Sequence, residues 1–487
     1  MTRQKEYLWL LGLTALGAAL RLSAIGAQSM WFDELISVAI VRLELLDALV
    51  LAASVDPPLY YLLLHFWVRL GSDDVMIRFL SAAVGIATIP AIYVLGRRLT
   101  NASVGLVAAL IFALAPLQLF YAQEARMYSL FVLLSTLSVW AYSRAQVSSR
   151  WRDWILWTCL MALVFYAHIF AGLLVLALDV DALWRWRSDK ADLRPVVTSN
   201  LAIGLTLVPW MLLLIPKMEY LVGILWLQRP TIFHPLLSLY YFVFGYTLAF
   251  PLSAVGLFVL LFALMLVLLS VWRGMRQGSK PESANLRLML LAAFLPLVVI
   301  FVISQWRSMY LDRWLLQSAP ALYLLFAWGL VCGDRRLALR LCAVPGLALM
   351  ILATVNYYSE PVYAKSPLRE AVGYIVTQRV PGELVIHTSG SSFLAGRHYD
   401  PAGEHILLQH PADQWLGPTL LESLRVPYDN DAGRMIMDKK TFWLVVALDH
   451  IPDEQRAAKA LFDQLARVTD ETEIGGIGIF HYARAAH

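Results

Sequence analysis

Two adjacent carboxylates, Asp33 and Glu34, follow directly after a long apolar segment, in the stretch SMWFDELISV at residues 29–38. An ionised carboxylate within hydrogen-bond reach of a hydroxyl group can take its proton, so either acid is a candidate general base. A second acid beside the base can hold it or orient a substrate hydroxyl. The structural alternative is that Asp33 caps the helix that follows and that the helix dipole favours Glu34.

Further ionisable residues stand at the ends of apolar segments, where a charge is costly without a partner or a water-filled cavity. The candidates for substrate or donor binding are Asp56, His65, Glu124, Arg126, His168 and Arg313. Their structural alternatives are a helix cap for Asp56, an ion pair of Glu124 with Arg126, a hydrogen-bonded interface ring for His168 and a helix-end anchor for Arg313. A base, a second acid and guanidinium groups together suit transfer of a group carried on a phosphate.

The composition places these residues in a membrane protein. Of 487 residues, 59% are hydrophobic and only 15% are charged, with a mean hydropathy of +0.63. Soluble domains are about half apolar and a quarter charged. The net charge is only +4, and no part of the chain forms a basic domain. No nucleic-acid partner is therefore expected. The cysteines Cys159, Cys332 and Cys342 have neither metal-ligand spacing nor a disulfide pattern.

The apolar segments predict about eleven transmembrane helices, since a span needs about 17–25 residues. They lie near 7–25, 75–96, 103–120, 126–143, 153–168, 170–184, 196–215, 251–272, 287–304, 314–331 and 337–355. If these segments alternate in direction, the arginine-rich connections gather on one side, which the positive-inside rule assigns to the cytoplasm. We therefore expect a multi-pass protein of the cell membrane with a cytoplasmic N-terminus. The alternative for 7–25 is a signal peptide.

Three apolar stretches break this alternation and are expected to be helices lying in the outer interface, at 34–51, 58–70 and 235–250. The first two belong to a first outer loop at 27–74 within a membrane domain of residues 1–357. Residues 358–487 are more polar and predict an extracytoplasmic α/β domain. Its strands are expected in LVIH, FWLVVAL and IGIFHY, its helices in SPLREAVGYIV and DEQRAAKALFDQLARV, and TSGSS at 388–392 reads as an ordinary turn.

Six motifs of the first 355 residues resemble, in order, the polytopic family-39 glycosyltransferases, the group of the bacterial relatives of the protein O-mannosyltransferases, the aminoarabinose transferases and the galacturonic acid transferases. They are WFDELIS, DPPLYYLLLHFWVRLG, IRFLSAAVGIATIPAIYVLGRRL, YAQEARMYSLFVLLSTLSVWAY, FYAHIFAGLLVL and DRWLLQSAPALYLLFAWGL. The resemblance implies an α-helical polytopic GT-C fold and a polyprenyl-phosphate sugar donor. It also implies inversion at the anomeric carbon and an acceptor hydroxyl of a lipid, glycan or protein outside the cytoplasm.

Carried over motif by motif, the resemblance makes Asp33 the base and Glu34 its neighbour, and assigns the donor phosphate to Arg126 or Arg313. Asp56 departs from the group, in which His or Lys often precedes the two prolines, so phosphate binding moves from that position to the arginines. No tightly held metal ion or other cofactor is implied, although Asp33, Glu34 and Asp56 form a set that attracts divalent cations.

Two other classes of protein compete with the enzyme. A transporter or flippase for a lipid-linked sugar would use the same polar residues along a path, but transporters usually bind at mid-membrane and carry internal repeats. The candidate residues gather instead on one side, and the sequence has no evident repeat. A membrane-anchored binding protein would need a recognisable site in residues 358–487, and none is evident. The enzyme is therefore the expected function.

Overall fold

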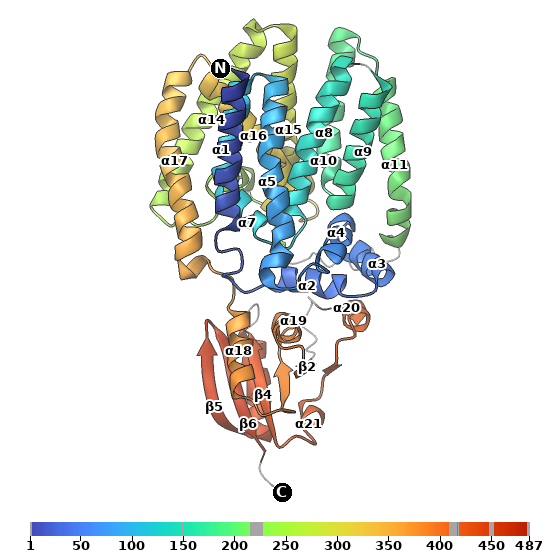
Figure 1. The fold of residues 1–487 in the computed structure, drawn as a ribbon, viewed down its shortest axis with the longest axis vertical. Helices are drawn as coiled ribbons and strands as arrows, with labels where there is room; N and C mark the ends of the chain where they lie inside the picture. The colour runs from blue at the N-terminus through green and yellow to red at the C-terminus, as the bar shows by residue number, and fades with distance from the viewer. Residues whose placement is uncertain are drawn as a thin grey trace. The chain divides into compact units, whose positions relative to one another are not determined.

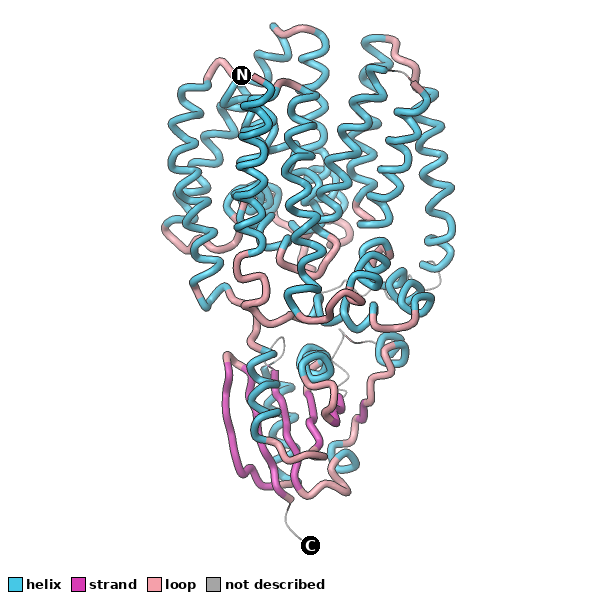
Figure 2. Tube along the Cα trace, in the orientation of Figure 1, coloured by secondary structure: helices cyan, strands magenta, loops and turns pink. Residues whose placement is uncertain are grey.

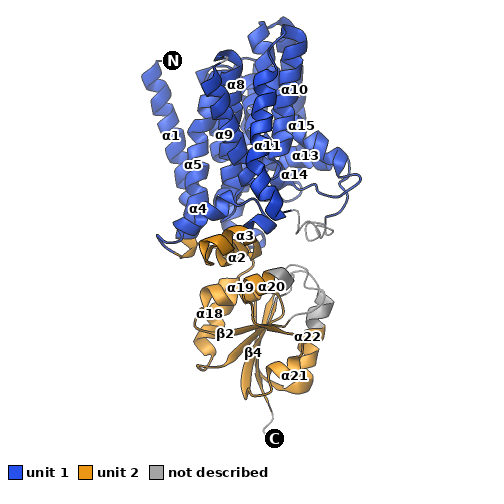
Figure 3. Cartoon of the chain, turned by 90° about the vertical axis from the view of Figure 1, so that its right-hand side faces the viewer, with its two compact units in different colours: residues 1–25, 52–71, 76–363 blue, residues 26–51, 72–75, 364–487 orange. Residues whose placement is uncertain are grey.

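The computed structural model describes residues 2–148, 150–214, 227–408, 416, 418–447 and 452–484. It divides into two compact units (Figure 3). Unit 1 comprises Met1–Ile25, Ala52–Gly71 and Met76–Tyr363, and unit 2 comprises Gly26–Leu51, Ser72–Val75 and Ala364–His487. Most of the first loop thus forms one compact body with the C-terminal residues, from which about 290 residues separate it.

Long helices that run alongside one another build unit 1 (Figure 1). They are α1 (Arg3–Leu22), α5 (Asp74–Leu99), α8 (Tyr128–Ser148), α9 (Trp151–Ala167), α10 (Ala171–Asp189), α11 (Arg194–Leu214), α14 (Leu252–Gln277), α15 (Lys280–Ile303), α16 (Ala319–Val331) and α17 (Arg336–Ser359). Large apolar side chains on these helices remain exposed, among them Leu205 on α11 and Phe258 on α14. Such a surface suits lipid, and it supports a multi-pass membrane protein.

All eleven apolar segments contain helix, but the number of spans is not confirmed. Among the described residues, six helices are long and apolar enough to cross a membrane, or seven if α6 (Ala102–Leu114) and α7 (Pro116–Ala122) form one bent span. Helix α10 shows why others fall short. It carries Asp179, Asp181, Arg185 and Arg187, and Asp181 is buried in salt bridges with Arg185 and Arg287.

The bend between α6 and α7 has a specific cause. Pro116 cannot donate the hydrogen bond that would continue α6, and the two helices meet at 63°. The freed carbonyl groups of Phe112 and Ala113 each accept a hydrogen bond of 3.2 Å from the guanidinium group of Arg21. This fully buried arginine thereby satisfies the open C-terminal end of α6.

Short helices occupy the stretches expected at the interface. They are α2 (Phe32–Val41), α3 (Leu45–Val55), α4 (Leu59–Trp67) and α13 (His234–Phe244), and the 3-10 helix η3 (Asp312–Ser318) precedes α16. The single helix expected at 34–51 is wrong, because two helices form there. Helix α2 ends with Arg42 as its C-cap and α3 begins at Leu45, and the Arg42 guanidinium group donates a hydrogen bond of 3.1 Å to the ring of His398.

A six-stranded sheet forms the centre of the C-terminal part of unit 2 (Figure 2). Its order is β3-β2-β1-β4-β6-β5, parallel from β3 to β4 and antiparallel at β6 and β5. The strands are β1 (Leu384–His387), β2 (Glu404–Leu408), β3 (Tyr428–Asp429), β4 (Thr441–Ala447), β5 (Arg467–Ile474) and β6 (Ile477–Ala483). The predicted α/β architecture is confirmed; β1, β4 and β6 were expected, and of the expected β4 stretch Leu448 lies outside the described residues.

The helices of this part are α18 (Leu368–Gln378), α19 (Gly390–Tyr399), α20 (Pro418–Ser423), α21 (Ala432–Met435) and α22 (Pro452–Leu465), with a 3-10 turn η4 (Pro361–Tyr363) before them. Helices α18 and α22 were expected. Helix α19 was not, since TSGSS reads as a turn. Ser389 accepts the Ser392 N–H and starts α19 directly after β1.

A chain of polar side chains lies buried beneath α19. His387 Nε2 is 2.9 Å from His405 Nδ1, and His405 Nε2 is 3.1 Å from Asp400 Oδ2, which Arg379 also binds. The carboxylate fixes the proton of His405 on Nε2, so His387 donates to His405 and both rings are neutral. Burial lowers the pKa of His387 well below its ordinary value and also lowers the pKa of His405.

We expect acid to destabilise this part of the protein. At pH 8, well above the ordinary histidine pKa of about 6.5, both rings are neutral in the folded and in the unfolded chain. As the pH falls below that value, both histidines become protonated in the unfolded chain and stay neutral in the folded one. The free energy of unfolding therefore falls by up to about 1.4 kcal/mol per pH unit for each histidine. Protection factors from amide hydrogen exchange in β1 and β2, measured at pH 8 and 5.5, should fall accordingly. His405→Gln, with one titrating ring fewer, should show a smaller fall; equal protection at both pH values contradicts the prediction.

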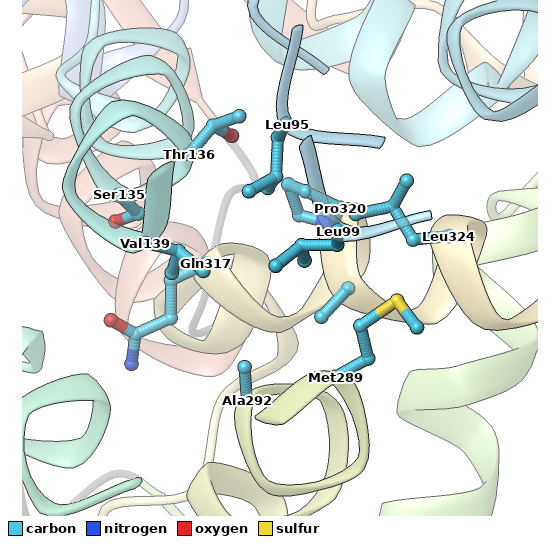
Figure 4. Close-up of a pocket in the computed structure, with 11 residues that line it drawn as sticks. Leu95, Leu99, Ser135, Thr136, Val139, Met289, Ala292, Gln317, Pro320 and Leu324 are labelled. Atoms are coloured by element: carbon cyan, nitrogen blue, oxygen red, sulfur yellow. The ribbon is translucent and has the colours of Figure 1, made fainter. Parts of the chain in front are cut away.

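A small cavity lies inside unit 1 between α5, α8, α15 and α16 (Figure 4). It has a volume of about 10 Å³ and is lined by Leu95, Thr136 and Met289, among others. That volume suits at most one water molecule. It is too small for a sugar or a lipid, so the candidate site is built from side chains elsewhere.

Candidate active site

Asp33 and Glu34 lie in the first turn of α2, in unit 2. The helix begins at Phe32 with Trp31 as its N-cap, so Asp33 is not the capping residue. A hydrogen bond of 2.9 Å from the Ser37 hydroxyl to the Asp33 carbonyl group ties the turn together.

Glu34 is fully buried and binds Trp31 and Lys365 in unit 2. Its Oε2 accepts a weak hydrogen bond of 3.4 Å from the Trp31 N–H and forms a salt bridge of 2.9 Å with Lys365 Nζ. Exposed fractions of 7% for the Lys365 side chain and 0% for the Glu34 side chain mean that water hardly screens the pair. Glu34 therefore anchors the start of α2, directly beside Asp33.

In unit 1, Arg126 forms its salt bridge with Asp56, over 2.8 Å between Nη2 and Oδ2. Tyr61, one turn into α4, donates a hydrogen bond of 3.0 Å to the same oxygen and accepts one of 3.0 Å from Arg126 Nη1. The Arg126 carbonyl group is held by the Ser81 hydroxyl of α5, at 3.1 Å. Asp56 is thus the ion-pair partner of Arg126 and not the cap of α4, whose N-cap is Pro58.

His168 ends α9 and lies buried against Phe131, with ring centroids 4.5 Å apart in a stacked arrangement. Its Nδ1 accepts the Phe170 N–H at 3.2 Å, so the neutral ring carries its proton on Nε2, where it can donate. The centroid of the Tyr128 ring lies 6.1 Å from that of His168, and the Arg313 guanidinium group lies 5.9 Å from the same Tyr128 ring. His168 and Arg313 are therefore both neighbours of Tyr128, which follows Arg126 by two residues.

Arg313 lies in η3, with its guanidinium group 5.9 Å from the centroid of the Tyr128 ring. Its chain neighbours are both fixed. Asp312 accepts a hydrogen bond of 2.5 Å from Ser238 of α13, and Trp314 stacks on Phe170 at 5.0 Å. The backbone on each side of Arg313 is thereby held, which restricts where its side chain can reach.

Two further candidates lie in unit 1. Glu124 is fully buried, and its carbonyl group accepts the Arg126 N–H at 2.8 Å in the turn between α7 and α8. His65 lies on α4, where Arg69 donates to its Nε2 over 3.0 Å. Arg69 follows the end of α4, and Tyr61, one turn before His65 on the helix, binds Asp56 and Arg126 instead.

Of the eight predicted residues, unit 1 joins Asp56 and Arg126 in a salt bridge and places His168 and Arg313 next to the same ring, that of Tyr128. Sequence reasoning missed residues that contact these candidates or their chain neighbours, namely Ser81, Tyr128, Ser238, Lys365 and His398. They are common residue types without a motif. Only their positions in the fold reveal them. In the described part of the chain, no three His, Cys, Asp or Glu side chains come together as a metal site.

Part of the chain matches a known protein family. Residues 55–212 match the family model of the dolichyl-phosphate-mannose-protein mannosyltransferases. That segment contains Asp56, His65, Glu124, Arg126 and His168. No curated protein sequence matches the chain.

Solved structures share the fold at low sequence identity. ArnT from Cupriavidus metallidurans, solved with bound undecaprenyl phosphate, superposes with a TM-score of 0.64 at 14% identity, over 97% of this chain and 98% of ArnT. The oligosaccharyltransferase of Archaeoglobus fulgidus with a tethered acceptor peptide has a TM-score of 0.58 at 11% identity, over 100% of this chain and 74% of its own. AglB of that organism, in complex with an inhibitory peptide and a dolichol-phosphate, gives 0.51 at 12% identity, over 99% and 75%.

These findings confirm the resemblance read from the six motifs and the expected GT-C fold. The family match and the fold together identify a membrane-bound enzyme, a glycosyltransferase.

Proposed function

We propose that the protein transfers a sugar from a polyprenyl-phosphate donor to an acceptor hydroxyl group outside the cytoplasm, with Asp33 as the general base. The observation that supports the proposal is the cluster around Tyr128 in unit 1: the Arg313 guanidinium group lies 5.9 Å from its ring, the ring of buried His168 lies 6.1 Å from it, and Arg126 precedes it by two residues. Two guanidinium groups and an Nε2–H donor suit a phosphate group. Binding of undecaprenyl phosphate by ArnT and of a dolichol-phosphate by AglB, proteins of the same fold, supports this choice of donor.

The proposed step moves one proton and exchanges one bond. The acceptor oxygen attacks the anomeric carbon, its proton passes to the Asp33 carboxylate, and the bond from that carbon to the phosphate oxygen breaks. Polyprenyl phosphate leaves with the bonding electrons, and the configuration at the anomeric carbon inverts. The arginines stabilise the charge that develops on the departing phosphate, and His168 Nε2–H donates a hydrogen bond to it.

We propose no metal ion in this step. Of the three acids that would attract a divalent cation, Glu34 faces Lys365 and Asp56 faces Arg126. A carboxylate already balanced by a cation is a weaker ligand for a second one. Turnover is therefore expected to persist in EDTA.

The test is release of free polyprenyl phosphate by purified protein in detergent, with a panel of radiolabelled undecaprenyl-phosphate sugars and envelope extract as the source of acceptor. An enzyme releases it only when acceptor is present, and the label moves to the acceptor. A flippase would leave the sugar–phosphate bond intact, and that result would refute the proposal. In sealed right-side-out vesicles, transfer to a membrane-impermeant acceptor is expected, as the extracytoplasmic site requires.

A further inference from the structure

Helix α2, which carries Asp33, packs on α19 of the C-terminal part of unit 2. The contacts lie at both ends of the helix. Before its start, the Met30 N–H donates to the Tyr399 hydroxyl at 2.9 Å. At its end, Arg42 donates to His398 Nδ1 at 3.1 Å. Two consecutive residues of α19 thus hold α2 from both ends.

Lys365, just before α18, and Arg369, in the first turn of α18, hold the chain just before α2. Lys365 Nζ binds Glu34, and the Lys365 N–H donates to the Gln28 side chain at 3.2 Å. Arg369 donates to the carbonyl groups of Gly26 and Ala27, at 2.9 and 2.6 Å. These residues have little freedom once the C-terminal part is folded.

Asp74 closes the far side of the first loop in the same way. It accepts hydrogen bonds from Tyr399 at 2.8 Å and from His398 Nε2 at 3.0 Å, and it forms a salt bridge of 3.4 Å with Arg369. Arg369, His398 and Tyr399 therefore bind both the start and the end of the first loop. Residues 26–51 and 72–75 are held as one piece by the C-terminal chain.

We propose that Lys365 is a positioning residue for the transfer reaction. Through its buried salt bridge with Glu34 it fixes the first turn of α2, and so the carboxylate of Asp33, which gives the C-terminal part of the chain a role in catalysis. The inference rests on the proposed function, because it requires Asp33 to be the base. A misplacement of a reacting group by about 1 Å can cost about 10²-fold in rate. A small shift of the first turn of α2 is therefore enough to slow the reaction.

Lys365→Met is expected to lower kcat by about 10²-fold while KM for the donor stays within about 2-fold, because the donor site is not touched. Lys365→Arg keeps the charge and should retain most of the activity. The double variant Lys365→Met with Glu34→Gln removes both buried charges. Its kcat should be about 10-fold higher than that of Lys365→Met alone. The control is Lys439→Met. It breaks the exposed salt bridge of 2.6 Å to Glu404 and should behave as the wild type.

Amide hydrogen exchange of residues 30–42 is measured on the same variants, in the full-length protein, and does not depend on activity. Faster exchange in this segment together with a lower kcat supports the proposal. Unchanged exchange in Lys365→Met overturns it, as does faster exchange with an unchanged kcat. If the wild type transfers no sugar, the proposed function fails, and the exchange data still decide whether Lys365 holds α2. Should Lys365→Met not fold, the double variant and Lys365→Arg carry the same comparison.

Discussion

Asp33→Asn is expected to lower kcat for sugar transfer by about 10³-fold, with KM for the donor nearly unchanged. The asparagine side chain has the same shape, and it can still accept a hydrogen bond from the acceptor hydroxyl. It cannot take up the proton at neutral pH, and a positioned general base contributes about 10²- to 10⁴-fold. The measurement is release of polyprenyl phosphate per folded protein at saturating donor and acceptor.

The matched control for this substitution is Asp47→Asn on α3, an exposed acid in the same loop. It should keep full activity, since Asp47 faces solvent. Both variants should show the thermal unfolding curve of the wild type, because an exposed or partly exposed carboxyl group contributes little to stability. Full turnover by Asp33→Asn would show that another group accepts the proton, and Asp33 would then be no more than a first-turn acid of α2.

The sequence predicted the helical segments and the residues of interest well, because both follow from local signals. Apolar runs of sufficient length predict helices in a membrane, and ionisable residues beside them stand out against so apolar a background. Arg126, His168 and Arg313 were identified in this way, and in unit 1 His168 and Arg313 both lie beside Tyr128, two residues after Arg126. The strands β1, β4 and β6 were equally visible as apolar runs between turn residues.

The partners of the candidate residues were harder to predict than the candidate residues themselves. The sequence suggested Glu124, two residues along the chain, as a partner for Arg126, and it gave no sign of the salt bridge that Arg126 forms with Asp56, 70 residues away. The Glu34–Lys365 salt bridge spans 331 residues, and nothing in the local sequence marks Lys365. Such contacts depend on how helices and loops are packed, which periodicity and composition do not encode.

The same limitation explains the predicted helix at 34–51. Its apolar residues continue past Arg42 without interruption, so the pattern extends the helix. In the structure α2 ends with Arg42 as its C-cap, and the guanidinium group of this residue binds His398, 356 residues away, a contact that the local pattern does not encode. The division of the chain into units also depends on such contacts, because they join residues 26–51 to a part of the chain that begins at Ala364.

Loss of either arginine is expected to weaken use of the lipid-phosphate donor. Arg313→Gln should lower kcat/KM for the donor by about 10²- to 10³-fold, since one preorganised donor to a developing negative charge has about that effect. Added undecaprenyl phosphate, the released product, should also inhibit this variant less strongly than the wild type. The control is Arg307→Gln, an exposed arginine six residues earlier in the same segment, with no expected effect.

Arg126 needs a different design, because Arg126→Gln also leaves the carboxylate of Asp56 without its cation. The resulting loss of activity could come from a destabilised fold. Asp56→Asn is therefore combined with Arg126→Gln, which removes both charges of the pair while Tyr61 can still hydrogen bond to the amide. If Arg126 only balanced Asp56, the double variant would recover wild-type kcat/KM. If Arg126 binds the donor phosphate, as we propose, the double variant folds normally but remains at least about 10²-fold slower.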